Sequence, residues 1–482
     1  MTAPTPPPCD SPHVVTRNKT PKTEDMPEEQ TNSKRQRLSS DHRSRSAFGV
    51  RRRNQGASVD ERRTPNGERR TVTVTGSVTV GQILSLTKSA ARTKFYPMIA
   101  QTKLTVPETF PPFSLSRLLK TVFNPSAGER VAILIDLDDP HEIKDLGFLK
   151  NPDLTIQRHA YEVFHLGLKN GVLRELGLTG GEMFAYKITG GSNLDLPDLA
   201  VAVDGTELSL EKDIYPNYKL ILCCSTYSAT APLTAFAKKY GFRGATLHGL
   251  NQIILSSGLA VDYDQVSKDA EKLRLGMTRA DWVEIDFTFG REKFSLHLDL
   301  GRQEAQKSHG LCRGGPDVAN LPAGEIYYVP TGASGQFPLK FEDGTIGLMS
   351  VKEGRIVDST LLKGSQQTID EHKRKVQSDP ATGELGELGF GTQLLPVSGR
   401  DIQDEKVLGT LHVATGRSDH LGGHLTPSKF QDSKNATHDD ILFAPHKTPE
   451  INVPQVRMLR NGKTEVLIEN FQPAAYMADL LL

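Results

Sequence analysis

The sequence predicts an α/β protein with two folded parts. An N-terminal doubly wound, mostly parallel α/β domain is expected over residues 127–270, followed by a mixed, largely antiparallel α+β domain over residues 271–482. The first prediction depends on short apolar runs, typical of buried parallel strands, that alternate with segments of helical periodicity. The second depends on apolar residues that recur at every other position from Trp282 onward, as in antiparallel strands with one buried face.

In the first part, buried strands are predicted where β-branched runs stand between polar residues, at 128–136, 219–224 and 245–250. Helices are predicted where large apolar residues recur every three or four positions, at 161–172 and 231–240. Strands that alternate with helices favour a doubly wound sheet, whose ligands bind beyond the carboxyl ends of the strands. The glycine fingerprint of a dinucleotide site is missing, so such a cofactor is not expected.

In the second part, a charged amphipathic helix is predicted over residues 262–275, before the pattern changes to alternation. Three tight turns then predict β-hairpins, at residues 290–293, Glu353-Gly354 and Asn461-Gly462. Hairpins join antiparallel neighbours, so this half should consist mainly of antiparallel sheet.

The chain before residue 127 has a different composition. Residues 1–70 hold 15 Lys and Arg against 9 Asp and Glu, whereas the whole chain has 58 of each. This segment is rich in Pro, Ser, Thr, Asn and Arg and poor in large apolar residues, which predicts a disordered basic tail. Nucleic acid is expected to bind only through this tail, and a solvated tail is favoured because interleaved aromatic residues that stack on bases are lacking. Residues 71–126 are expected to be a partly ordered lead-in, with a strand over 70–80 and a helix over 114–122.

The cysteines and apolar runs bear on where the protein resides. Four cysteines, without CxxC pairs or a disulfide framework, favour a reducing compartment. The apolar runs are too short to span a bilayer, and the N-terminus lacks the features of a signal peptide. A cytoplasmic protein with no membrane contact is therefore expected.

Five residues of the second part are of the types that bind divalent metal ions: Glu325, Glu387, His412, His438 and Asp440. Imidazole nitrogen and carboxylate oxygen hold zinc, cobalt and manganese. Two such ions repel each other when close, and a shared carboxylate offsets that repulsion. If His438 and Asp440 lie on a strand, they project from the same face, because one residue separates them. The sequence therefore predicts a site for two divalent ions that holds a water and polarises a carbonyl group.

The residues around these five resemble the metal-site segments of the aminopeptidase T family of dinuclear, leucyl aminopeptidase-type metallo-aminopeptidases. The similar segments are Asn320-Leu321-Pro322-Ala323-Gly324-Glu325, Leu385-Gly386-Glu387, the stretch from Gly409 to Arg417, and His438-Asp439-Asp440. The resemblance implies a homodimeric hydrolase that removes N-terminal residues from peptides or small aminoacyl substrates with two zinc, cobalt or manganese ions. It implies further that all five residues bind metal and that Glu387 is also the general base.

One position departs from that family. A tyrosine thought to stabilise the oxyanion lies seven residues after the histidine that matches His412, and this chain has Asp419 there. An ionised carboxylate cannot donate a hydrogen bond to an oxyanion. Either Arg417 or His420 is expected to take that role, or peptide hydrolysis has been lost.

A related branch with the same fold provides a second hypothesis. Dihydroxypyridine ring-cleaving dioxygenases resemble these peptidases but use one Fe(II) held by two histidines and a carboxylate, here His412, His438 and Asp440. The retention of Glu325 and Glu387 speaks against this hypothesis, since one iron ion would not need them. A third hypothesis is a non-catalytic, peptidase-like protein that binds a partner through its basic tail.

Overall fold

The computed structural model describes residues 104–482. The basic tail of residues 1–70, the strand expected over 70–80 and most of the lead-in lie outside the described residues. Within residues 104–482, every helix is too short or too polar to cross a membrane. Helices occur together with parallel and antiparallel sheets, so the predicted mixed α/β class is confirmed.

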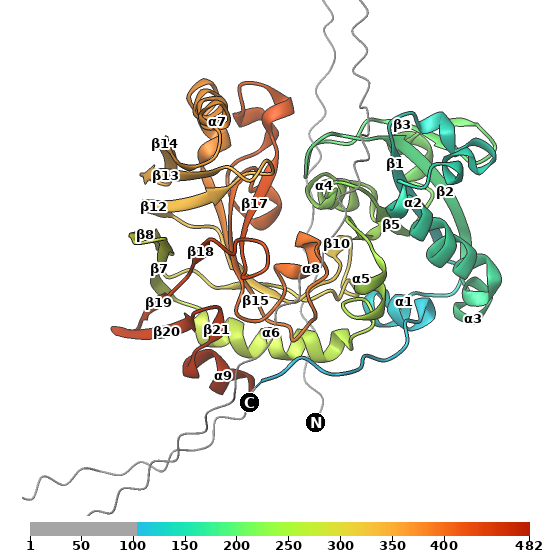
Figure 1. Ribbon diagram of the computed structural model, residues 1–482. Helices are drawn as coiled ribbons and strands as arrows, with labels where there is room; N and C mark the ends of the chain where they lie inside the picture. The colour runs from blue at the N-terminus through green and yellow to red at the C-terminus, as the bar shows by residue number, and fades with distance from the viewer. Residues whose placement is uncertain (1–103) are drawn as a thin grey trace, which may run out of the picture. The chain divides into compact units, whose positions relative to one another are not determined.

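A seven-stranded sheet forms the first part of the fold, in the order β10-β6-β5-β1-β2-β3-β4 (Figure 1). Its strands are β1 (Arg130–Leu137), β2 (Thr179–Lys187), β3 (Leu199–Ala202), β4 (Glu207–Ser209), β5 (Leu220–Cys224), β6 (Arg243–Thr246) and β10 (Asp317–Asn320). The strands from β10 to β2 pair in parallel, and β3 and β4 add an antiparallel edge. Strands predicted over 128–136 and 219–224 are confirmed as β1 and β5.

The third predicted strand differs from the observed one. β6 ends at Thr246, whereas the expected strand ran over 245–250. After Thr246 the chain leaves the sheet and turns at Gly249, which has a φ of +63°. An apolar run alone does not show where a strand ends, because Leu247 and Leu250 are buried outside the sheet.

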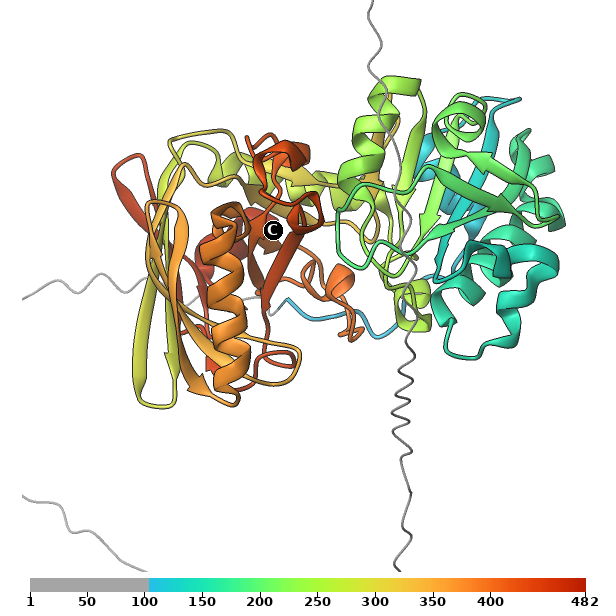
Figure 2. The same ribbon diagram turned by 90° about the horizontal axis from the view of Figure 1, so that it is seen from above.

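Helices cover both faces of this sheet, as the doubly wound arrangement requires (Figures 1 and 2). They are α1 (Leu115–Phe123), α2 (Thr155–His159), which continues through π-helical turns into α3 (Leu173–Leu176), α4 (Thr230–Tyr240) and α5 (Gln252–Ser256). Ile133 and Ile135 of β1 belong to the core beneath α1 and α2. Ala132 and Leu134, on the other face, belong to the core beneath α4. The helix predicted over 114–122 is confirmed, with Ser114 as its N-cap.

Two further sheets make up the second part. The five-stranded sheet has the order β17-β16-β15-β11-β9, and the nine-stranded sheet has the order β14-β13-β12-β8-β7-β19-β20-β21 with β18 beside β7. Their strands are β7 (Ala280–Phe289), β8 (Glu292–Asp299), β9 (Gln306–Ser308), β11 (Glu325–Tyr328), β12 (Gly332–Lys340), β13 (Ile346–Lys352), β14 (Arg355–Lys363), β15 (Leu385–Gly391), β16 (Leu411–Gly416), β17 (His438–Phe443), β18 (Ile451–Asn452), β19 (Gln455–Arg460), β20 (Lys463–Glu469) and β21 (Gln472–Pro473). Side chains of both sheets, such as Phe287, Phe337 and Val413, share one core.

All three predicted hairpins are confirmed. Antiparallel pairs join β7 to β8, β13 to β14, and β19 to β20 around the predicted turns. The helix predicted over 262–275 is also confirmed as α6 (Tyr263–Met277), which Asp262 caps. The boundaries at residues 70, 126 and 270 stay predictions; β10 follows residue 270 in the chain and belongs to the first sheet.

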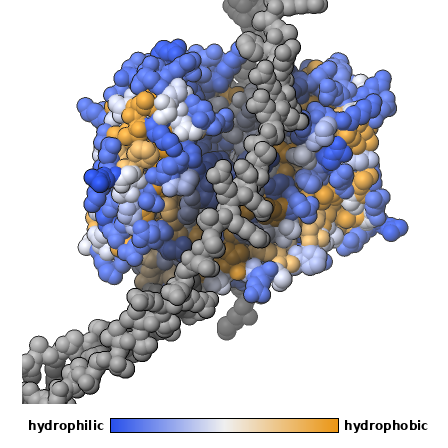
Figure 3. Space-filling model, in the orientation of Figure 1, coloured by the Kyte–Doolittle hydropathy of each residue, from blue (hydrophilic) through white to orange (hydrophobic). Residues whose placement is uncertain are grey.

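The remaining α-helices of the described part are α7 (Gln366–Ser378), α8 (Asp401–Asp404) and α9 (Ala475–Leu481). The face shown in Figure 3 is mainly hydrophilic, and hydrophobic residues gather toward its lower edge, near α6. Leu275 of α6 is among the exposed large apolar side chains. Helices α6 and α9 contact each other.

Candidate metal centre

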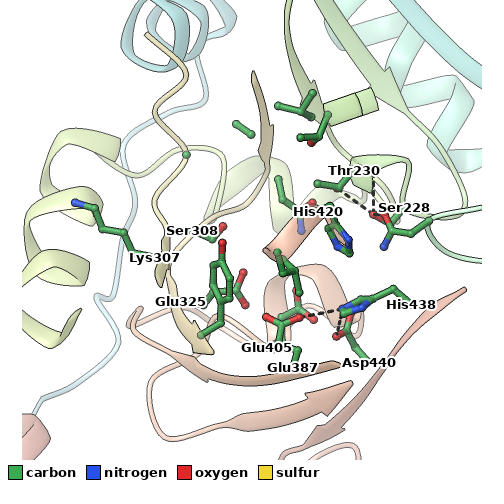
Figure 4. Close-up of a pocket in the computed structure, with 18 of the residues that line it drawn as sticks. Ser228, Thr230, Lys307, Ser308, Glu325, Glu387, Glu405, His420, His438 and Asp440 are labelled. Atoms are coloured by element: carbon green, nitrogen blue, oxygen red, sulfur yellow. Dashed lines mark hydrogen bonds and ion pairs between the residues drawn. The ribbon is translucent and has the colours of Figure 1, made fainter. Parts of the chain in front are cut away.

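The five expected metal ligands lie on four neighbouring strands of the five-stranded sheet. They are Glu325 on β11, Glu387 on β15, His412 on β16, and His438 and Asp440 on β17. In the antiparallel register, Gly416 pairs with His438 and Ala414 pairs with Asp440. The register of the sheet therefore brings together side chains that are far apart in the chain, and Figure 4 shows Glu325, Glu387, His438 and Asp440 around one pocket.

A pocket of about 300 Å³ lies in front of these side chains, and all five line it (Figure 4). Its other walls come from the first part, from β9 and from the loop between β9 and β10. They include Ser228, Thr230, His248, Lys307 and Ser308. This volume is at the low end for ligand pockets, so the pocket suits a small molecule.

His438 is held in one orientation. Its Nδ1 donates a hydrogen bond to the backbone carbonyl of Arg417 at 2.6 Å. Its Nε2 faces the pocket, 2.9 Å from Oε2 of Glu387 and 3.3 Å from Oδ1 of Asp440. Metal-binding histidines are commonly oriented by a hydrogen bond from the other ring nitrogen to a carbonyl group. Nδ1 thus has the orienting partner that a metal-binding histidine needs, and Nε2 faces the other candidate ligands.

His412 presents its Nε2 to three carboxylates without bonding closely to any of them. The distances are 3.5 Å to Oε1 of Glu387, 3.7 Å to Oε2 of Glu325 and 3.9 Å to Oδ1 of Asp440. Metal–ligand bonds of about 2.0–2.2 Å separate neighbouring ligand atoms by roughly 3–4 Å, so this spacing suits a shared ion. Within residues 104–482, Oε2 of Glu325 has no hydrogen-bond partner, although it is buried.

Glu387 occupies the middle of the cluster. Glu325, Glu387 and His412 form one group of ligand atoms within 4.8 Å of one another, and Glu387, His438 and Asp440 form a second. The side chains of Glu387 and His438 are almost fully buried, whereas that of Asp440 is 30% exposed toward the pocket. Buried imidazoles and carboxylates in this arrangement form a candidate site for a divalent metal ion.

Sequence reasoning missed a buried cation beside these groups. The Lys406 side chain is 1% exposed, and its Nζ lies 2.7 Å from Oε1 of Glu325 and 2.5 Å from Oε1 of Glu405. Burial would lower the pKa of Lys406, but Glu325 and Glu405 outweigh it and raise that pKa, so the ammonium stays charged. Within the charged run from Asp404 to Lys406, no periodicity distinguishes a buried lysine from a solvated one.

The carboxylates determine the ionisation of the two histidines. Burial would lower the pKa of His412, but hydrogen bonding and charge from Glu387 raise it to about 10. Burial likewise opposes the charge on His438, yet Asp440 and Glu387 hold its pKa well above the usual value. The pKa of Glu387 is lowered, because the two imidazoliums outweigh the effect of its own burial. The cluster therefore balances its charges as imidazolium–carboxylate pairs, and a bound metal ion has to displace those protons.

The residues expected to replace the oxyanion tyrosine lie in different surroundings. Arg417 donates to Asp419 at 2.8 Å, to Asp195 at 2.9 Å and to the carbonyl of Asn193 at 2.8 Å, and it does not line the pocket. His420 does line the pocket, with its ring 5.0 Å from that of His438 in an edge-on arrangement. Burial lowers the pKa of His420, so it is a neutral imidazole.

Among the other residues near the motifs, Tyr327 lines the pocket. Tyr328 points elsewhere and donates to the carbonyl of Met277 at 2.8 Å. His424 contacts Glu384 at 2.9 Å, away from the ligand cluster. Burial raises the pKa of the Cys312 thiol to about 11, so it is not an activated nucleophile.

Comparison with known proteins gives little similarity. No family model and no curated protein matches the chain. Among solved structures, 2,5-dihydroxypyridine dioxygenase from Pseudomonas putida KT2440 is similar, with 12% sequence identity and a TM-score of 0.49. The match covers 75% of this chain and 97% of that one.

The expectation of a metallo-aminopeptidase of the aminopeptidase T family is therefore wrong, and so are the expected hydrolase activity and proteolysis. No family model supports it, and the similar solved structure is a dioxygenase. Of the two residues expected to replace the oxyanion tyrosine, Arg417 binds Asp419 rather than the pocket. The expected homodimer and a nucleic acid contact through the tail stay predictions.

Gly389 has no side chain and so leaves open the space that the imidazole ring of His412 occupies. It pairs with His412 across β15 and β16, and a Cβ there would overlap the imidazole ring. We expect Gly389→Ala to displace the ring and weaken binding of Zn(II) or Mn(II) by about 10–100-fold, as loss of an orienting contact does. Titration with a competing chelator measures this. Gly314→Ala is the matched control, because its Cβ would meet open space; equal affinity in both variants would contradict this account.

Metal affinity should rise steeply with pH. His412, with a pKa raised to about 10, and His438, with a pKa well above the usual value, both carry a proton at neutral pH that metal binding must release. Raising the pH toward 10 removes that competition, so affinity should increase by up to about 100-fold per pH unit for two released protons. Calorimetry in buffers of different ionisation enthalpy counts the protons. Affinity that stays constant between pH 6 and pH 8.5 would refute the proton competition.

Proposed function

We propose that this protein is a mononuclear Fe(II)-dependent dioxygenase that cleaves a small hydroxylated aromatic ring. The observation that carries the proposal is the position of Oδ1 of Asp440, which lies 3.3 Å from Nε2 of His438 and 3.9 Å from Nε2 of His412 at the edge of one pocket. Two histidines and one carboxylate with open positions are the ligand set of non-haem Fe(II) oxygenases. Ferrous iron held in this way supplies the redox chemistry that lets molecular oxygen react with an organic ring.

The retained glutamates no longer speak against a single ion. Glu325 has a cationic partner in Lys406, so it does not need a second metal ion to balance its charge. Glu387 lies between the two histidines and accepts from Nε2 of His438. In the proposed site iron would take the Nε2 atoms that Glu387 now faces, and Glu387 would contribute negative charge next to the dication.

Neutral imidazoles are available to handle a substrate proton. His248 and His420 both line the pocket, and burial lowers the pKa of His248 to about 4. For each of them, Nδ1 is buried and finds no hydrogen-bond partner in the described part of the chain. We assign both as candidates to hydrogen-bond a ring hydroxyl, and His420 as the candidate to accept its proton, because a pKa of about 4 makes His248 a weak base near pH 7. Ser228 and Thr230 offer hydroxyl groups on the same wall.

The pocket also limits the substrate. Its volume of about 300 Å³ accommodates one ring with small substituents rather than a peptide. Leu421, Val318 and Tyr327 supply apolar and aromatic surface among the polar side chains. The similar solved structure acts, by its title, on 2,5-dihydroxypyridine, which suggests dihydroxylated pyridines and benzenes as the first compounds to test.

Oxygen uptake tests the proposal. Protein loaded anaerobically with Fe(II) should consume oxygen and remove the ring absorbance of a dihydroxylated aromatic substrate. His412→Ala and Asp440→Asn should each lose at least about 100-fold in iron affinity and uptake, because a ligand of the ion is gone. Glu325→Gln should still bind iron. Iron-loaded protein that consumes no oxygen with any ring in a broad panel would contradict the proposal, as would loss of iron in Glu325→Gln as complete as in His412→Ala.

A further inference from the structure

A buried lysine lies where metal-binding residues would otherwise be free to hold a second ion. Lys406 Nζ contacts Oε1 of Glu325 and Oε1 of Glu405, and both carboxylates, like Lys406 itself, line the pocket. Hydrogen bonds between an ammonium and a carboxylate are charge-assisted and strong. The burial of Lys406 means that water does little to screen its charge.

A second ion would need the carboxylate of Glu325, which Lys406 already binds. The group formed by Glu325, Glu387 and His412 has ligand atoms within 4.8 Å of one another, and it is the only group besides that of Glu387, His438 and Asp440 in the described part of the chain. With His412 bound to the first ion, a second ion would depend on Glu325 and Glu387. Glu325 binds Lys406 through one oxygen. A dication on the other oxygen would be within a few ångströms of the ammonium, and like charges at that distance in a buried site repel strongly.

The backbone holds Lys406 in this position. Lys406 follows α8, and its carbonyl accepts from the backbone N–H of Gln393 at 2.8 Å, just after β15. A Cβ on Gly391, at the end of β15, would overlap the backbone of Lys406 and Val407. Glycine at this position therefore lets the segment of Glu405 and Lys406 approach the strand that carries Glu387.

We propose that the Lys406 ammonium takes the place of a second metal ion, so that this pocket holds a single divalent ion bound by His412, His438 and Asp440. The inference rests on the single-ion site of the proposed function but does not depend on oxygen chemistry. Lys406 is here a residue that determines the number of bound metal ions. Its single positive charge binds Glu325 and Glu405, and it excludes a second ion, which would carry two positive charges. A purely structural ion pair would stabilise the fold and leave the metal number unchanged.

Metal content tests this inference with Mn(II) and Zn(II) alone as probes. The wild-type chain should bind one ion at saturation, and bound Mn(II) should give the resonance of an isolated ion. Lys406→Met, which removes the charge but keeps the length, should bind two ions and give the signal of a coupled pair. Lys307→Met is the matched control, because Lys307 lines the same pocket but pairs with Glu271 at 2.9 Å; it should bind one ion.

A second variant covers the case in which Lys406→Met does not fold. Lys406→Gln can still donate hydrogen bonds to Glu325 but carries no charge, so it should also bind two ions. Two ions in the wild-type chain, or one ion in every folded Lys406 variant, would overturn the inference. One ion in the wild-type chain and two in the Lys406 variants, without oxygen uptake, would remove the proposed function and leave the role of Lys406 in place. Oxygen uptake with one ion in every folded Lys406 variant would do the reverse.

Discussion

Compensation of buried charge is the constraint on which the centre of this protein depends. The carboxylates of Glu325, Glu387 and Glu405 are buried together, and Asp440 joins them from β17. Two like unit charges at 4 Å repel by about 4 kcal/mol at an effective dielectric of about 20, so such a cluster needs cations nearby. The protein supplies them as Lys406, His412 and His438. A metal ion that enters replaces protons on the histidines, while the charge of Lys406 stays.

The sheet allows these charged side chains to lie close together because it leaves them little conformational freedom. Antiparallel register places His412 opposite Gly389 and Asp440 opposite Ala414, so small residues stand beside the charged ones. The apolar core on the other side of the same strands, which includes Val413 and Phe443, holds the strands in place. Polar groups therefore converge on one face, and hydrophobic burial on the other face provides the rigidity that a metal site requires.

Much of the fold could be predicted from local pattern, and the candidate site only in part. Alternation identified the hairpin of β7 and β8, and the spacing of His438 and Asp440 predicted their common strand face. The aminopeptidase interpretation failed because one-ion and two-ion sites use the same residue types, so the residues alone do not determine the number of ions or the reaction. Lys406 was missed because the feature that matters, its burial against Glu325, arises from contact between segments far apart in the chain.

Crystals of the protein loaded anaerobically with Fe(II) would test the central claim most directly, by anomalous scattering at the iron edge. The account predicts one peak, bonded to Nε2 of His412, Nε2 of His438 and a carboxylate oxygen of Asp440, with Lys406 still paired to Glu325. A second peak on Glu325, or a single peak that leaves either histidine unbound, would contradict it.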